Sequence, residues 1–223
     1  MSADVIKGDK AHAAIDIRNV TIAFDDQAVL TRFSLTVAGG ERVCLRGASG
    51  SGKSTLFRCL LGLHVPQSGQ IWIAGKQVSP DTIWRLRGQI AWVPQGPDWG
   101  QTRVRTLLEL PFTFQSNRAQ RTMLDQMPDR LAQVDLPVSI LEKRADSLSG
   151  GEKQRLALVA ALLLNRPILL VDEGTSGLDA ENRDRIRKCL GAETRDRTIL
   201  AISHEAEAET WCDRLVDLET GHA

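Results

Sequence analysis

The sequence of 223 residues has no tyrosine, no net charge at neutral pH and no long apolar run. A helix that spans a bilayer needs about 20 consecutive apolar residues, and no stretch approaches that length. A balanced charge gives no overall positive field, so we expect no nucleic acid partner. The length and the ordinary composition predict a single globular α/β domain.

The four cysteines, Cys44, Cys59, Cys189 and Cys212, lie far apart and show no C-x-x-C spacing. This pattern predicts buried free thiols in a reducing compartment, and neither a metal site nor a disulfide scaffold. The first ten residues lack the apolar segment of a signal peptide. We therefore expect the chain in the cytosol or on the cytosolic face of a membrane.

Residues 47–54, with the sequence GASGSGKS, match the phosphate-binding pattern G-x-x-x-x-G-K-[ST]. The flanking residues predict a strand before this loop and a helix after it. Such a loop points free N–H groups at an anion, and the helix dipole favours negative charge there. We expect Lys53 to contact the β- and γ-phosphates of a nucleoside triphosphate and Ser54 to bind Mg²⁺. The alternative is a glycine-rich turn that matches by chance.

The remaining elements are predicted from hydrophobic periodicity. Alternating apolar residues over 15–37 predict antiparallel strands, and apolar stretches at 70–74, 89–93, 168–171, 198–202 and 215–218 predict further strands. Ser79 and Pro80 predict the start of a helix. Between residues 96 and 147 the period becomes helical and prolines interrupt it. Strands that alternate with helices indicate a mostly parallel sheet, here with a helical insertion.

Two carboxylates, Asp172 and Glu173, directly follow the apolar stretch 168–171. The carboxyl end of a buried parallel strand is where ligands bind in open α/β sheets. We expect Asp172 to hold Mg²⁺ through water and Glu173 to orient or deprotonate an attacking water. The alternative is a strand that ends in two solvated acids.

Residues 148–152 read LSGGE, in which Ser149 and Glu152 have the spacing of a helix capping box. The two glycines Gly150 and Gly151 then lie in the first helical turn, where each costs about 1 kcal/mol relative to alanine. This cost indicates close approach by a partner group, and bare N–H groups at a helix N-terminus suit an anion. An ordinary capped helix explains the segment equally well.

These motifs resemble, in order and over nearly the whole chain, those of the ATP-binding cassette (ABC) ATPases. Residues 47–54 are similar to the Walker A motif, 168–172 to Walker B, and 148–152 to the family signature. The resemblance implies a P-loop NTPase (RecA-like) fold: a mostly parallel sheet core with an N-terminal antiparallel β subdomain and a helical insertion. It implies one domain over 1–223, with 1–95 and 166–223 as the α/β core and β subdomain and 96–165 as the helical subdomain that carries the signature.

The resemblance also implies roles for single residues. The catalytic set is Glu173, His204 as the switch histidine, Gln95 as the Q-loop glutamine, and Lys53. The Mg²⁺ ligands are Ser54, Gln95 and Asp172. The residues implied to bind ATP are Phe24, Gly47, Ala48, Ser49, Gly50, Ser51, Gly52, Lys53, Ser54, Thr55, Ser149, Gly150, Gly151 and Asp179. Since the chain has no tyrosine, Phe24 is the aromatic residue expected to stack on adenine.

In the family, two copies sandwich two ATP molecules. Each site combines Walker A of one copy with the counterparts of Ser149, Gly150 and Gly151 of the other, so the anion at this helix would be the γ-phosphate of the partner's ATP. His204 would contact that phosphate, and Asp179 would carry information across the dimer. Gly174 stands where the family usually has proline, which leaves the stiffness of this loop open.

The implied function is that of the ATP-hydrolysing subunit of a bacterial ABC transporter, peripheral on the cytoplasmic face of the inner membrane, which powers a separate integral membrane permease. We expect Trp99 and residues 107–114 to receive the permease. Segments around Pro111, Pro137 and the signature resemble the FetA/YbbL-like group, which is linked to iron export. The alternative is a soluble non-transport ABC ATPase in iron–sulfur assembly or complex remodelling. The signature argues against a P-loop kinase or GTPase.

Overall fold

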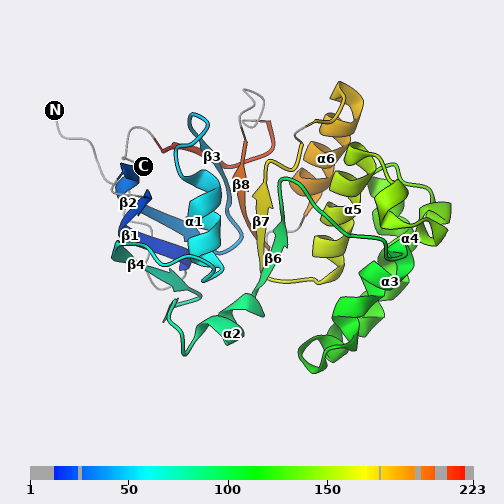
Figure 1. Ribbon diagram of the computed structural model, residues 1–223, viewed down its shortest axis with the longest axis horizontal. Coiled ribbons are helices and arrows are strands. Elements are labelled where there is room, and N and C mark those ends of the chain that lie inside the picture. Colours follow the sequence, from blue (N-terminus) through cyan, green and yellow to red (C-terminus); the bar gives the residue numbers. More distant parts are fainter. Residues whose placement is uncertain (1–12, 25–26, 176, 194–196, 204–209, 219–223) are drawn as a thin grey trace.

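Two β-sheets organise the computed structural model, which describes residues 13–24, 27–175, 177–193, 197–203 and 210–218 (Figure 1). The first is a five-stranded sheet in the order β6 (Ile90–Val93), β7 (Ile168–Asp172), β8 (Thr198–Ile202), β3 (Arg42–Arg46) and β9 (Arg214–Asp217). All its strand pairs are parallel. Every residue of β7 and β8 is buried, as expected for central strands covered on both faces. The predicted parallel sheet is therefore confirmed.

The second sheet is antiparallel and has the order β2 (Gln27–Ala38), β1 (Ala13–Phe24), β4 (Ser68–Ile73) and β5 (Lys76–Gln77). In β1 the apolar residues Ile15, Ile17, Val20 and Ile22 are buried, and they pack with helix α1 (Lys53–Leu60) and one face of the parallel sheet. In Figure 1, α1 accordingly stands beside β1 and β3. This sheet is the predicted antiparallel β subdomain.

Helices cover the other face of the parallel sheet, to the right in Figure 1. Their apolar residues form one core cluster with alternate residues of β3, β6, β7 and β8. The helices are α3 (Val104–Glu109), α4 (Met127–Gln133), α5 (Gly150–Leu163) and α6 (Ala180–Ala192), with 3-10 segments at Leu110–Thr113, Gln115–Gln126, Val138–Glu142 and Ala145–Ser147. The predicted helical character after residue 96 is thus present, although much of it is 3-10 rather than α-helical.

The predicted helix start at Ser79 and Pro80 is wrong, because α2 runs over Ile83–Arg87 with Thr82 at its N-cap. The Thr82 hydroxyl accepts a hydrogen bond from the Ser79 N–H at 3.0 Å and donates one to the Gln77 carbonyl at 2.5 Å. These bonds close a turn over 79–82 before the helix begins. A side chain that bonds the local backbone in this way competes with helix formation.

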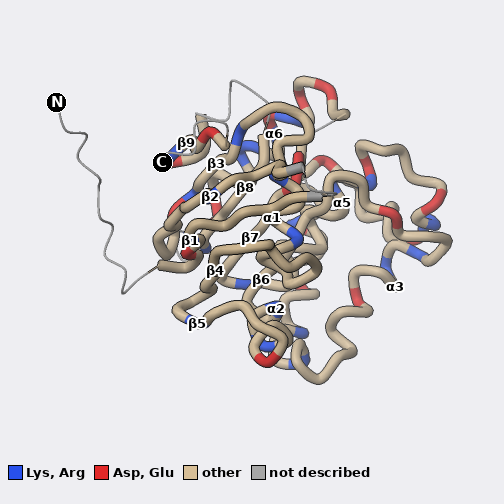
Figure 2. Tube along the Cα trace, turned by 60° about the vertical axis from the view of Figure 1, so that its left-hand side comes forward, with Lys and Arg blue, Asp and Glu red and all other residues tan. Residues whose placement is uncertain are grey.

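The surface mixes charges of both signs. Figure 2 shows blue and red segments interspersed along the described trace, in keeping with a formal net charge of zero. Within the described ranges, no helix combines the length and the apolar character needed to cross a bilayer.

Candidate functional site

The predicted phosphate loop, the two carboxylates and Gln95 meet at one edge of the parallel sheet. The loop follows the carboxyl end of β3, the carboxylates lie at the carboxyl end of β7, and Gln95 lies just beyond the end of β6. Because these strands are parallel, their carboxyl ends share one edge. A cavity of about 370 Å³ opens there, lined by Val29, Ser49, Gly50, Gly52, Lys53, Ser54, Thr55, Gln95 and Glu173. Sequence reasoning found all of these residues except Val29.

The loop between β3 and α1 depends on glycine at Gly52, which has a φ of +88° and lies at the N-cap of α1. A Cβ there would lie 3.3 Å from Val29 Cγ2, so β2 packs closely against the loop. No side chain among the described residues caps the α1 N-terminus by a hydrogen bond. The N–H groups of the first turn are therefore suited to bind a phosphate.

Lys53 is 5% exposed, and its ammonium group lies within the loop. It donates hydrogen bonds to the carbonyls of Gly47 at 2.8 Å and Ala48 at 2.7 Å, and to Ser51 Oγ at 3.2 Å. These bonds hold a positive charge at the centre of the loop. The charge is placed to attract the phosphates of a nucleotide in the cavity.

Ser54 and Asp172 join the loop to β7, because Ser54 Oγ donates to Asp172 Oδ1 at 3.1 Å. Asp172 is 4% exposed. Its burial raises the pKa of its carboxyl group, and the Glu173 charge adds to the rise, whereas the Ser54 hydrogen bond lowers it. A hydroxyl and a buried carboxylate so close together fit Mg²⁺, which prefers oxygen ligands and whose charge would keep the carboxylate ionised.

Glu173 lies beside this pair, and Gln95 Nε2 donates to Glu173 Oε2 at 2.6 Å. The Glu173 backbone has a φ of +50°, which is rare outside glycine, and its N–H donates to the Ile202 carbonyl at 3.2 Å. The left-handed turn thus directs the Glu173 side chain into the cavity and onto Gln95. The structure thereby joins Gln95, the predicted Q-loop glutamine, directly to the predicted catalytic carboxylate.

Gly174 follows this turn and is buried, and a Cβ added to it would lie 2.5 Å from Val171 Cγ1. We expect Gly174→Ala to lower the free energy of unfolding by about 1–3 kcal/mol, because the extra methyl overpacks the end of β7. Urea denaturation measures the change. The second substitution Val171→Ala should restore part of the loss, whereas Gly96→Ala, with open space around it among the described residues, should have little effect. Equal stability of all these variants would contradict the close packing at Gly174.

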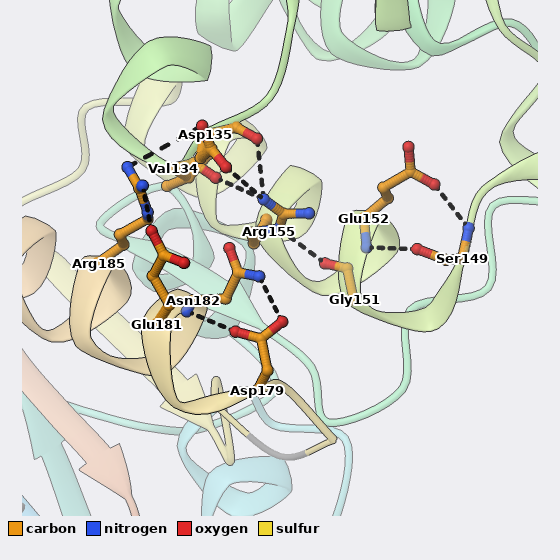
Figure 3. Close-up of polar contacts among 10 residues, drawn as sticks. All are labelled: Val134, Asp135, Ser149, Gly151, Glu152, Arg155, Asp179, Glu181, Asn182 and Arg185. Atoms are coloured by element: carbon orange, nitrogen blue, oxygen red, sulfur yellow. Dashed lines mark hydrogen bonds and ion pairs between the residues drawn. The ribbon is translucent and has the colours of Figure 1, made fainter.

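The signature residues begin α5 with the predicted capping box (Figure 3). Ser149 Oγ accepts from the Glu152 N–H at 3.2 Å, and Glu152 Oε2 accepts from the Ser149 N–H at 2.8 Å. Ser149 and Gly150 are exposed, and among the described residues none of the signature positions lines the 370 Å³ cavity. A Cβ at Gly151 would lie 3.0 Å from Leu178 Cδ2, so this helix start packs against the segment that precedes α6.

Asp179 is the N-cap of α6 and lies close to the signature helix (Figure 3). Its carboxylate accepts from the backbone N–H and from Nδ2 of Asn182, both at 2.8 Å. These bonds, aided by the charge of Arg155, lower the pKa of Asp179. Arg155 itself donates to the carbonyls of Val134 at 3.0 Å and Asp135 at 2.9 Å, which fastens the end of α4 to α5.

Two predicted residues cannot be placed with the others. The side chain of Phe24 and the whole of His204 lie outside the described residues. Conversely, Val29 and Arg155 contribute to the site or its support but have no motif of their own. Val29 acts by packing and Arg155 by bonding backbone carbonyls, and neither role requires a recognisable pattern in the sequence.

Comparisons with known proteins agree with this geometry. The ABC transporter family matches residues 30–176. Among curated proteins, Nod factor export ATP-binding protein I of Rhizobium meliloti is 37% identical over 97% of this chain, which spans 65% of that relative's length. Energy-coupling factor transporter ATP-binding protein EcfA1 of Mycoplasma pneumoniae is 32% identical over 94% of this chain and 77% of its own length.

Solved structures show the same fold. The ATP-binding subunit of an ABC transporter matches with a TM-score of 0.82 and 28% identity, over 93% of this chain and 87% of its own. A dimeric ATP-binding cassette in a post-hydrolysis state, bound to ADP and Pi, matches with a TM-score of 0.79 and 26% identity, over 93% of this chain and 95% of its own. The chain belongs to the ABC transporter family and carries the ATP-binding domain of that family.

Proposed function

We propose that the chain binds ATP with Mg²⁺, hydrolyses it as a dimer and thereby powers a separate membrane permease. The observation that supports this most directly is that Lys53, Ser54 and Glu173 line one cavity and that Asp172 is hydrogen-bonded to Ser54 beside it. Lys53 and Ser54 begin the helix that follows β3, whereas the two carboxylates lie at the end of β7, and β8 separates these two strands in the sheet. Such a combination of charge, hydroxyl and carboxylates suits the electrostatic demands of phosphoryl transfer.

In this proposal some residues bind the nucleotide and Mg²⁺, and Glu173 acts on the attacking water. Lys53 and the N–H groups of the loop hold the phosphates, and Ser54, Asp172 and Gln95 hold Mg²⁺, which neutralises phosphate charge. Glu173 orients and deprotonates the attacking water. The 2.6 Å bond from Gln95 engages one Glu173 oxygen, so a movement of Gln95 would change what that oxygen can bind.

The proposed dimer completes each site with the signature of a second copy. Support comes from the exposure of Ser149 and Gly150, from their position at a helix N-terminus, and from the similar cassette that was solved as a dimer with ADP and Pi. Asp179 is exposed next to the signature helix, which suits a contact across the same interface. His204 is proposed to contact the γ-phosphate.

The permease is proposed to dock on Leu110 and Phe114, which are 48% and 59% exposed. Their neighbours Leu108 and Phe112 are buried in the helical core, and Trp99 packs against the same core. The predicted docking residues therefore fall into two groups. Leu110 and Phe114 are exposed and can contact a partner, whereas Leu108, Phe112 and Trp99 pack in the core beneath them.

The double substitution Leu110→Glu and Phe114→Glu should weaken permease binding roughly 100-fold. Burial of two large apolar side chains contributes about 3 kcal/mol or more to the free energy of binding. Co-purification from detergent-solubilised membranes, with tagged chain as bait, measures this. Val138→Glu is the matched control, because Val138 is 52% exposed but lies in another segment. Undiminished recovery of the permease with the double variant would refute this docking surface. A partner set free of membrane proteins would favour the soluble, non-transport role.

The finer proposal is that the transported substrate is iron, exported by a FetA/YbbL-like transporter. It is supported by the resemblance of the segments around Pro111, Pro137 and the signature. Among the described residues, no group of three His, Cys, Asp or Glu side chains is placed to hold a metal ion, so the proposal assigns the iron site to the permease. ATP-dependent accumulation of radiolabelled iron in inside-out vesicles tests it. Accumulation that is equal with and without ATP would refute iron export.

A further inference from the structure

Gln154 is a buried polar residue on the helix that begins with the signature. It lies in the second turn of α5, and it is 3% exposed. The other buried residues of α5 are all apolar. Transfer of an amide out of water costs about 1–3 kcal/mol unless the amide finds a hydrogen-bond partner. Packing alone therefore does not account for a glutamine at this position.

The Gln154 amide bonds the backbone directly before Gln95. Gln154 Nε2 donates a hydrogen bond to the Pro94 carbonyl at 3.2 Å. Pro94 follows the last residue of β6, and α5 packs against that strand (Figure 1). Because proline has no N–H to donate to a neighbouring strand, the chain leaves the sheet at this residue. The Gln154 side chain thus fastens the point at which the chain leaves β6 to the signature helix.

Gln95 extends this connection to Glu173. The Pro94 carbonyl and the Gln95 N–H belong to one planar peptide group, so the bond from Gln154 fixes the orientation of the peptide that carries Gln95. Gln95 Nε2 in turn donates to Glu173 Oε2 at 2.6 Å. Since Gln95 is exposed, packing does little to hold its side chain, and its position depends on the backbone. Two hydrogen bonds therefore lead from the signature helix to the predicted catalytic carboxylate.

We propose that Gln154 is a positioning residue, which holds Gln95 against Glu173 and so connects the signature helix of a copy to the carboxylate of the same copy. Its effect on turnover rests on the proposed ATPase function, whereas the connection itself needs no nucleotide. In the proposed dimer, residues 149–151 at the start of α5 contact the partner's ATP. A displacement of α5 at that contact would reach Glu173 through Pro94 and Gln95, and this would link the two ATP sites.

NMR spectra of the full, nucleotide-free chain labelled with ¹⁵N test the connection directly. Gln154→Met removes the amide and nearly conserves the side-chain volume, so the core should stay packed. We expect it to shift the resonances of the Gln95 side-chain amide and of the Glu173 N–H. Gln126→Met, the same replacement at an exposed position, is the matched control and should leave both resonances in place. A Glu173 resonance that does not move in Gln154→Met would overturn the proposal.

Steady-state ATP hydrolysis tests the consequence for turnover. Gln154→Met should lower kcat roughly 10- to 100-fold, because a small misplacement of a catalytic group can cost about 100-fold. The KM for ATP should stay unchanged, since Lys53 and the phosphate loop are intact. If Gln154 acts through Gln95, Gln154→Met should have little further effect in a chain that already carries Gln95→Ala. Losses that multiply in the double variant would mean a different route and would overturn the proposal.

Gln154→Glu provides a second measurement that does not depend on the methionine variant. An ionised carboxylate cannot donate to the Pro94 carbonyl, whereas a protonated carboxyl group can. Because burial raises the pKa of a carboxyl group, the kcat of this variant relative to that of the unaltered chain should rise as the pH falls from about 8 to 6. The ratio cancels the protonation of Glu173 itself, which occurs in both chains. A constant ratio would contradict the role of the hydrogen bond.

The two kinds of measurement separate this proposal from the proposed function. An unaltered chain that hydrolyses no ATP would refute the ATPase function, and the NMR resonances of Gln95 and Glu173 would still decide whether Gln154 positions them. Normal hydrolysis in the unaltered chain, together with an unchanged kcat in Gln154→Met, would refute the positioning role and leave the ATPase function in place.

Discussion

Replacement of Glu173 by glutamine should lower the rate of ATP hydrolysis by about 10²- to 10⁴-fold, the usual contribution of a general base. Glutamine has the same shape, and its amide oxygen can still accept the bond from Gln95 Nε2 that now ends on the Glu173 carboxylate at 2.6 Å. The variant therefore keeps the geometry of the cavity and loses only the ability to accept a proton. ATP binding should persist, because Lys53 and the phosphate loop are unchanged.

The rate of phosphate release under saturating ATP and Mg²⁺ measures the loss of hydrolysis. Size-exclusion chromatography should show an ATP-dependent dimer, which accumulates because it cannot hydrolyse the bound ATP. Glu109→Gln is the matched control, since Glu109 is an exposed acid on α3 whose carboxylate lies 3.9 Å from the Arg105 guanidinium. It should retain the original rate. A Glu173→Gln chain with normal turnover would remove Glu173 from the proposed catalytic role, and a chain that no longer binds ATP would show that Glu173 is needed for structure instead.

The site was predictable from sequence wherever a local pattern encodes it. The Ser149–Glu152 box needs only a spacing of three residues. Asp172 follows a run of buried residues, and that run alone indicates a central parallel strand. Parallel strands then bring their carboxyl ends to one edge regardless of the loops between them, which is why the cavity contains so many of the predicted residues.

The parts that could not be predicted depend on long-range packing or on competing local bonds. The pairing of β3 with β9 places Cys44 opposite Leu215, and no pattern near either residue in the sequence predicts that pairing. The α2 helix begins after Thr82 rather than after Ser79, and the Thr82 hydroxyl bonds two backbone groups of the preceding turn instead of the helix. The left-handed Glu173 backbone is set by the turn at the end of β7 and has no signal in the sequence.

The proposed sharing of each ATP site between two copies predicts that two inactive variants restore activity when mixed. Lys53→Met removes the charge held in the loop, and loss of hydrogen bonds from a charged group, about 1.5–3 kcal/mol, should weaken ATP binding roughly 10- to 150-fold. Gly150→Glu instead damages the signature. A Cβ at Gly150 meets open space among the described residues, and an acid in the first turn of a helix is favourable.

Gly150→Glu should therefore leave α5 at least as stable while its carboxylate repels the partner's γ-phosphate, and each variant alone should hydrolyse little ATP.

In a mixed dimer, one site pairs the intact loop of the Gly150→Glu chain with the intact signature of the Lys53→Met chain, whereas the other site carries both defects. Half of the randomly formed dimers are mixed, so an equimolar mixture should recover up to about a quarter of the original turnover if the sites act independently. Gly150→Ala, which adds a methyl without charge, is the control for the backbone change. No recovery on mixing, with both chains folded, would mean that Lys53 and Gly150 act in the same copy, and the shared site would have to be abandoned.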